Sequence, residues 1–289
     1  MKRQLFLATI ALAVFISACS TNSGDKTVSD TGSAKKIVSV GGSATEIVYA
    51  LGEGANVVGV DTSSVYPEEA TKLPQVGYQR QLSAEGVISL KPSIVIMLPE
   101  AGPPAAIKQI EDAGIKVLKL NNESTAEGTR IKIRQVGEAL DRKDKAEEII
   151  AKLNNELAEA EKLVAESKNK PSVIFIYSRG TGAAQVGGTG TPAEAIIKMA
   201  GGENAVTEFS DYKTLTPEAL ISAKPDFILL PSRAVASLGG IDGILAMPGV
   251  KDTPAGQNKR IIAIDDMLLL GFTPRLGEGV KELHEKLKQ

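Results

Sequence analysis

The chain of 289 residues carries 33 Lys and Arg against 35 Asp and Glu, which gives a formal net charge of −2. No basic run is interleaved with aromatic residues, which argues against nucleic-acid binding. With one histidine, one cysteine and no tryptophan, the chain also lacks the ligands of a protein-built transition-metal site.

Residues 1–19 predict an export signal. Lys2 and Arg3 supply its charged start and residues 5–16 its apolar core, which is shorter than the ~20 residues that span a bilayer. Cys19 follows this core in a segment that resembles the bacterial lipobox, where the cysteine is lipidated and becomes the mature N-terminus. The alternative is an ordinary cleavage site with an incidental cysteine.

Residues 20–35 are mostly Ser, Thr, Gly, Asp and Lys. Such a stretch cannot bury a core, so it predicts a flexible tether between the membrane and the folded part. Because Cys19 is the only cysteine, the fold relies on its hydrophobic core, which a chain of this length supplies without disulfides.

From residue 36 onward, short apolar runs alternate with helical patterns, which predicts an α/β fold. Residues 36–128 form a first α/β lobe, residues 129–169 one long linking helix, and residues 170–289 a second α/β lobe. The helix is predicted from an amphipathic, proline-free stretch with apolar residues at helical spacing. The predicted strands are Ile37–Val40, Val57–Val60, Ile94–Leu98, Val117–Leu120, Val173–Tyr177, Phe227–Leu230 and Ile261–Ile264.

The two lobes contain similar segments. Residues 82–92 match residues 215–225, and the Gly-rich residues 41–48 match residues 187–196, with two extra residues in the second copy. Two related Rossmann-like lobes joined by one helix imply a cleft between them. Ligands bind in such clefts, outside the strand ends of α/β sheets.

Tyr78 and Arg80 lie two residues apart in a Gly-containing loop before a predicted helix. A phenolate is a hard anionic ligand suited to ferric heme iron. A neighbouring guanidinium lowers the pKa of the phenol and so favours its charged form. The pair indicates a heme-iron site. The alternatives are a packed surface tyrosine and a surface ion pair between Arg80 and Glu85.

The lipobox, the two lobes and the linking helix together resemble the helix-linked class of substrate-binding proteins, which serve importers of metals, siderophores, cobalamin and heme. Residues 73–80 and residues 268–276 resemble the heme branch of that class. The resemblance implies a lipid-anchored, extracytoplasmic monomer that is not an enzyme. It would bind ferric heme b in the cleft and deliver it to an ABC permease and its ATPase. The alternative is the same scaffold binding cobalamin or a ferric siderophore.

Within this resemblance Tyr78 is the axial ligand of the heme iron and Arg80 its partner. Some members add a histidine from the second lobe. Here the only histidine, His284, lies among charged residues of the last helical segment, where we expect a solvated face, so we expect a five-coordinate iron. Tyr212 stands in the second-lobe copy close to the position of Tyr78, so we expect it to face Tyr78 across the cleft; the alternative is inherited repeat architecture with no ligand contact. Arg233 and Arg179 follow predicted strands, and we expect them to bind the heme propionates because Arg pairs well with carboxylates.

Glu46 and Glu194 each occupy the third helical position of a capping-box pattern, and Pro192 supports a helix start in the second copy. The resemblance implies a second role, in which one acidic residue on each lobe docks onto arginines of the permease. Charge complementarity of this kind orients transient interfaces. The sequence therefore predicts Glu46 and Glu194 as docking residues, with capping compatible.

An exported α/β enzyme is the alternative from a different functional class. The segment around Gly41 and Gly42 lacks both the GxGxxG spacing and the lysine of a phosphate-binding loop. No GxSxG motif is present, and one histidine near the C-terminus argues against a Ser-His-Asp triad. A purely structural lipoprotein, with no saturable ligand, is the remaining alternative.

Overall fold

The computed structural model describes residues 35–178 and 184–289. The predictions for Cys19, for the export signal, for the tether up to residue 34 and for Arg179 lie outside these residues. Within the described part, no helix is both long enough and apolar enough to cross a membrane.

The N-terminal lobe is built on a parallel four-stranded sheet with the order β2-β1-β5-β6. Every residue of β1 and β5 is buried, as expected for central strands of a parallel sheet that is covered on both faces. The four strands predicted here are confirmed within one residue at each end. The lobe contains β1 Ile37–Val40, α1 Gly42–Ala50, β2 Val57–Val60, β3 Gly77–Tyr78, β4 Gln81–Leu82, α2 Ala84–Ser89, β5 Ile94–Met97, α3 Pro104–Asp112 and β6 Lys116–Lys119, with short 3₁₀ turns at Gly54–Asn56 and Glu68–Lys72.

The C-terminal lobe is built on a six-stranded sheet with the order β10-β8-β7-β11-β12 and with β9 beside β7. β7, β11 and β12 are parallel, whereas β8 runs antiparallel to β7 and β10. The three predicted strands of this lobe are confirmed. The lobe contains β7 Ser172–Tyr177, β8 Gln185–Gly187, α6 Pro192–Met199, β9 Glu203–Asn204, β10 Tyr212–Thr214, α7 Pro217–Ala223, β11 Phe227–Pro231, α8 Ser232–Ser237, α9 Gly240–Leu245, α10 Pro254–Gln257, β12 Ile261–Ile264, α11 Asp266–Leu270 and α12 Leu276–Leu287, with a 3₁₀ turn at Val250–Asp252.

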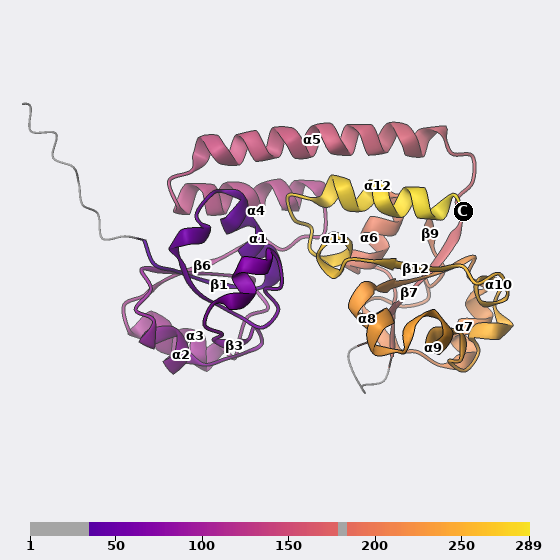
Figure 1. The fold of residues 1–289 in the computed structure, drawn as a ribbon, viewed down its shortest axis with the longest axis horizontal. Coiled ribbons are helices and arrows are strands. Elements are labelled where there is room, and N and C mark those ends of the chain that lie inside the picture. Colours follow the sequence, from indigo (N-terminus) through magenta and orange to yellow (C-terminus); the bar gives the residue numbers. More distant parts are fainter. Residues whose placement is uncertain (1–34, 179–183) are drawn as a thin grey trace, which may run out of the picture. The chain divides into compact units, whose positions relative to one another are not determined.

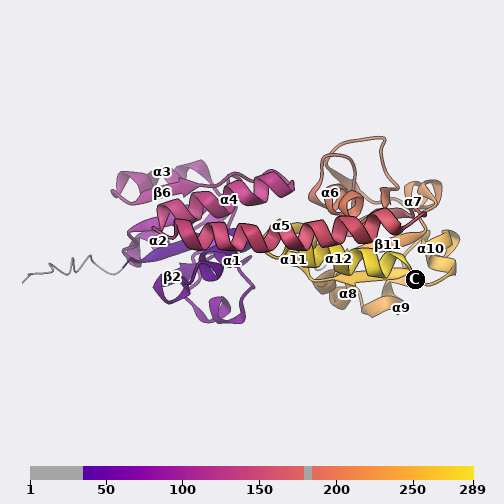
Figure 2. The same cartoon turned by 90° about the horizontal axis from the view of Figure 1, so that it is seen from above.

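The single linking helix predicted over residues 129–169 is wrong in detail, because the structure has two helices there. α4 spans Ala126–Ala139 and α5 spans Lys143–Glu166. They are separated at Asp141, whose φ of 56° lies in the left-handed region that a continuous right-handed helix excludes. Only α5 extends along both lobes (Figures 1 and 2), and its 24 residues give about 36 Å of helix.

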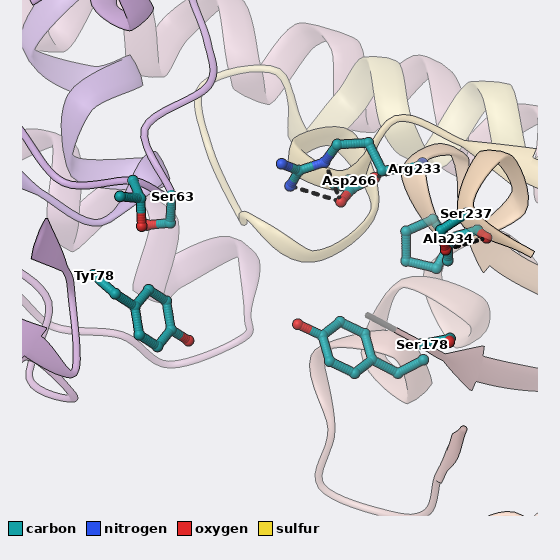
Figure 3. A pocket seen from close by; sticks show the side chains of 10 residues that line it. Ser63, Tyr78, Ser178, Arg233, Ala234, Ser237 and Asp266 are labelled. Atoms are coloured by element: carbon teal, nitrogen blue, oxygen red, sulfur yellow. Dashed lines mark hydrogen bonds and ion pairs between the residues drawn. The ribbon is translucent and has the colours of Figure 1, made fainter. Parts of the chain in front are cut away.

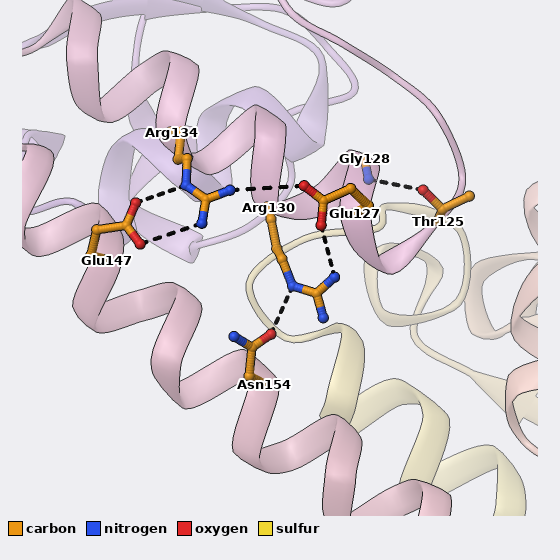
Figure 4. Close-up of polar contacts among 7 residues, drawn as sticks. All are labelled: Thr125, Glu127, Gly128, Arg130, Arg134, Glu147 and Asn154. Atoms are coloured by element: carbon orange, nitrogen blue, oxygen red, sulfur yellow. Dashed lines mark hydrogen bonds and ion pairs between the residues drawn. The ribbon is translucent and has the colours of Figure 1, made fainter.

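α4 and α5 form an antiparallel hairpin. Its surface carries ion pairs and hydrogen bonds (Figure 4), including Arg134 to Glu147 at 2.8 Å and Arg130 to Asn154 at 2.7 Å. Such exposed pairs contribute little to stability. The hairpin is held mainly by apolar burial, for example of Leu153 on α5, since burying a Leu side chain contributes about 1.5–3 kcal/mol.

One hydrophobic cluster runs through both lobes along α5. It includes Ile47 of α1, Ile133 of α4, Leu153 of α5, Phe175 of β7 and Leu283 of α12. Each lobe has a second, separate cluster of its own. The two lobes therefore share a packed core on the side of α5.

The expectation that His284 lies on a solvated face is wrong. The side chain is 2% exposed, and its Nδ1 lies 2.9 Å from the carbonyl oxygen of Ala200. α12 packs against both α5 and α6, so the turn that carries His284 faces the core. Charged sequence neighbours suggested solvent because they occupy the opposite side of the same helix.

Candidate ligand-binding site

The carboxyl ends of the parallel strands in both lobes border one cleft. Parallel α/β sheets place loops, and hence ligand sites, at this edge. The residues that line the cleft just after a strand, or at its last position, come from both sheets: Gly42 and Ser43 after β1, Ser63 after β2, Leu98 after β5, Tyr177 at the end of β7, Arg233 after β11 and Asp266 after β12. The predicted cleft between the lobes is therefore present.

The cleft contains two adjoining cavities of about 260 and 550 Å³. Residues of the N-terminal lobe form one wall and residues of the C-terminal lobe the other. The same five side chains border both cavities: Ser63, Tyr78, Tyr177, Arg233 and Asp266. These shared residues mark the centre of the site (Figure 3).

Tyr78 is placed by a small antiparallel hairpin formed by β3 and β4, rather than by the irregular loop predicted. Gly77 precedes it with φ of 99°. A Cβ at Gly77 would lie 2.7 Å from the carbonyl oxygen of Gln81, so the tight approach of the two strands requires glycine. Tyr78 is half-buried and borders both cavities, while the exposed Arg80 at the hairpin turn borders the larger one.

Asp61 is a positioning residue that the sequence reasoning missed. Its side chain is completely buried and accepts hydrogen bonds from the backbone N–H groups of Gly41 at 2.7 Å and Gln79 at 3.2 Å. It also accepts from the hydroxyls of Ser63 at 2.6 Å and Ser64 at 2.7 Å. One buried carboxylate thus ties the β1–α1 turn, the loop after β2 and the tyrosine hairpin together. An Asp directly after a buried strand was the available signal.

The C-terminal wall carries a group of three aromatic rings. The ring centres of Tyr177 and Tyr212 lie 6.0 Å apart, and Phe175 lies 6.4 and 6.3 Å from them. Burial, together with the neighbouring Tyr177 and Asp211, raises the pKa of Tyr212. Tyr212 borders the larger cavity as a neutral phenol, so it is a poor anionic ligand.

Arg233 lies at the start of α8 and is held by Asp266, the first residue of α11. Its Nε donates to Asp266 Oδ2 at 2.8 Å, its Nη2 lies 2.7 Å from the same oxygen, and its backbone N–H donates to Oδ1 at 3.3 Å. The structure therefore brings Tyr78, Arg80, Tyr212 and Arg233 to one cleft, as expected.

Glu46 does not lie at an exposed tip. It is 3% exposed and accepts two hydrogen bonds from Arg275 of the C-terminal lobe. The expected capping box is also absent at α1, because that helix begins at Gly42 with Gly41 as its N-cap. The role of Glu46 is corrected from surface docking to an ion pair between the lobes.

Glu194 is 9% exposed. Its Oε2 accepts from the backbone N–H of Gly190 at 2.7 Å and its Oε1 lies 2.7 Å from Lys198 Nζ. Thr191 is the N-cap of α6 and Pro192 its first residue, so the predicted helix start is confirmed. The carboxylate is used for local capping and pairing rather than presented to a partner.

Two α/β lobes, a cleft at their carboxyl strand ends and a helix along both lobes define a ligand-binding protein of the helix-linked type. The chain belongs to the periplasmic binding protein family, whose sequence model matches residues 37–268. Membership of this family and the binding proteins among its relatives make the chain a non-enzymatic component of a transporter.

The relatives include a lipoprotein, a vitamin-binding protein and a heme-binding protein. The uncharacterized ABC transporter substrate-binding lipoprotein YvrC of Bacillus subtilis (strain 168) is 31% identical over 82% of this chain and 75% of its own length. The vitamin B12-binding protein of Vibrio vulnificus (strain CMCP6) is 26% identical over 82% of this chain and 84% of its own. The solved structure of the periplasmic heme-binding protein RhuT from Roseiflexus sp. RS-1, in apo form, is 42% identical. The alignment with RhuT covers 88% of this chain and 97% of the RhuT chain, with a TM-score of 0.85.

Proposed function

We propose that the protein captures ferric heme in the cleft, with the phenolate of Tyr78 as the axial ligand of the iron. The observation that carries the proposal is the position of Tyr78 at the centre of the cleft, on a hairpin fixed by the buried Asp61. Similarity to RhuT, a heme-binding protein, supports the same cargo.

The residues around Tyr78 suit this cargo. Arg80 at the turn of the same hairpin and Arg233 on the opposite wall both border the larger cavity, and Arg233 provides N–H donors for a propionate. Leu98, Met267 and Leu270 border the larger cavity and offer apolar surface to the porphyrin. Because the only histidine, His284, lies on the buried face of α12 against Ala200, we propose a five-coordinate iron.

A hemin titration of the purified protein, followed by absorption spectroscopy, tests the proposal. Wild type should show saturable binding and a ferric spectrum with a tyrosinate charge-transfer band. Tyr78→Phe should lose that band and most of the affinity, because it removes the ligand oxygen. Tyr212→Phe is the matched control and should keep the band. If Tyr78→Phe keeps the wild-type spectrum, Tyr78 is not the axial ligand.

Cobalamin is the second candidate cargo. The wall of the larger cavity includes the amides of Gln79, Asn122 and Gln185, which can pair with amide groups on a corrin ring, and the relatives include a vitamin B12-binding protein. Saturable binding of cyanocobalamin, with no saturable binding of hemin, would replace heme by cobalamin on the same scaffold.

Delivery to an ABC permease requires exposed contacts on both lobes. We propose Glu85 and Glu218 for this role in place of the buried Glu46 and Glu194. They occupy equivalent positions of the internal repeat, each as the second residue of a short helix, and both are exposed. Neither forms an ion pair within residues 35–178 and 184–289. α2 and α7 both lie on the side of the lobes away from α5 (Figure 1).

The docking proposal is tested with Glu85→Ala plus Glu218→Ala. The double variant should bind hemin as wild type does but fail to support uptake in cells, because arginines on the permease would lose their partners. Glu111→Ala plus Glu208→Ala, at other exposed positions of the two lobes, is the control. Normal uptake by the first double variant would refute the docking surface.

Lipidation at Cys19 would hold the monomeric protein at the membrane beside that permease.

A further inference from the structure

Asp266 holds the side chain of Arg233 along one edge. Both Nε and Nη2 of the guanidinium approach the same carboxylate oxygen, at 2.8 and 2.7 Å. The backbone N–H of Arg233 donates to the other oxygen at 3.3 Å. A single carboxylate therefore fixes both the backbone and the side chain of Arg233.

The contact leaves the outer edge of the guanidinium available. Arg has five N–H donors in a rigid planar fork, and Asp266 uses the side edge formed by Nε and one N–H of Nη2. The outer edge, formed by Nη1 and the other N–H of Nη2, can also bind a carboxylate through two parallel hydrogen bonds. In Figure 3 the tip of Arg233 points toward the side of the cleft that carries Ser63 and Tyr78.

Asp266 is itself fixed by its helix. The neighbouring Asp265 is the N-cap of α11, and its Oδ1 accepts from the backbone N–H groups of Met267 at 3.0 Å and Leu268 at 3.1 Å. The side chain of Asp266 is only 18% exposed, whereas that of Arg233 is 56% exposed. The more buried carboxylate thus restrains a long side chain that otherwise has much rotamer freedom.

We propose that Asp266 is a positioning residue that presents the outer edge of Arg233 to a carboxylate of the bound ligand. For heme, and resting on the proposed function, that group is a propionate. The negative charge of Asp266 opposes the approach of a second carboxylate, but charges at an open cleft are screened by water and salt. Fixing the fork in advance lowers the ordering cost that binding would otherwise carry.

The test compares hemin with hemin dimethyl ester, which lacks both carboxylates, in wild type, Asp266→Ala, Asp266→Asn and Arg233→Ala. Asp266→Ala should weaken hemin binding roughly tenfold and leave the ester unchanged. Asp266→Asn keeps an acceptor oxygen and should retain most of the affinity. In the Arg233→Ala background, Asp266→Ala should have no further effect.

Three outcomes would overturn the inference. Tighter hemin binding by Asp266→Ala would mean that Asp266 acts mainly as a repelling charge. Equal weakening of hemin binding and ester binding, with a lowered thermal midpoint, would mean that Asp266 only stabilises the fold. The Asp266→Asn variant separates this case from a failure to fold. Failure of wild type to bind hemin at all would instead reject the proposed cargo, and the inference with it.

Discussion

Arg275 and Glu46 join the two lobes through a two-pronged ion pair. Nε and Nη2 of Arg275 donate to the two carboxylate oxygens at 2.9 and 2.8 Å, although the residues are 229 positions apart in the sequence. The guanidinium also lies 3.6 Å from the ring centre of Tyr66. Glu46 and Arg275 each follow a cavity-lining glycine, Gly42 and Gly271, by four residues.

Removing one partner of this pair should destabilise the protein strongly. Glu46→Ala leaves a largely buried guanidinium without its carboxylate, which typically costs about 3–5 kcal/mol. Arg275→Ala should cost a similar amount. The double variant should lose less than the sum of the two, because no charge is left uncompensated. Urea unfolding measures the three values, and strict additivity would contradict a coupled pair.

Because of Lys132, the free energy of unfolding should depend on pH in the alkaline range. Burial lowers its pKa to about 8, against the opposing effects of Glu100 and Glu46, while its Nζ donates to Asn122 Oδ1 at 3.3 Å and to Gly271 O at 3.2 Å. Between about pH 8 and 10.5 the unfolded chain binds more protons than the folded one. The free energy of unfolding therefore rises with pH across this window, by at most about 3 kcal/mol.

Lys132→Met provides the comparison. It keeps an apolar stem but has no proton to lose, so its free energy of unfolding should lack the rise that wild type shows. At pH 7 it should be the more stable protein. Urea unfolding of both at several pH values from 7 to 10.5 gives the difference directly, and parallel pH profiles would rule out Lys132 as the source.

His284 should matter for stability and not for the cargo. His284→Ala removes the ring next to the carbonyl of Ala200 and opens a cavity between α12 and α6. We expect a loss of about 2 kcal/mol or more in the free energy of unfolding. The spectrum of the hemin complex should stay that of wild type. A changed ferric spectrum in a fully folded His284→Ala variant would show that His284 does bind the iron.

The phenol of Tyr212 should ionise only at strongly alkaline pH. Burial first, and then Tyr177 and Asp211, raise the pKa of Tyr212, whereas an iron-bound phenolate must be ionised near neutral pH. In an ultraviolet titration of the hemin-free protein, Tyr212→Phe should remove only the most alkaline part of the phenolate signal. Loss of an earlier-ionising component would show that Tyr212 is a competent anionic ligand.

The sequence by itself determined the α/β class, the seven predicted strands and the position of Tyr78 at the border of the cleft. Each depends on a local pattern: apolar runs long enough for a buried strand, or a tyrosine in a Gly-containing loop before a predicted helix. Gly77 before Tyr78 marked the turn, since its positive φ needs glycine. Local signals of this kind can be read because neighbours in the chain fix them.

Only the tertiary structure decided the break at Asp141, the burial of His284, the pairing of Glu46 with Arg275 and the hold of Asp266 on Arg233. No glycine or proline marks the helix break, and Asp141 enters the left-handed region where the chain must reverse to pack α5 on α4. The other three depend on partners 33 to 229 residues away. A charged or titratable side chain carries no sequence signal of whether solvent or a distant partner will satisfy it, because that is settled by packing.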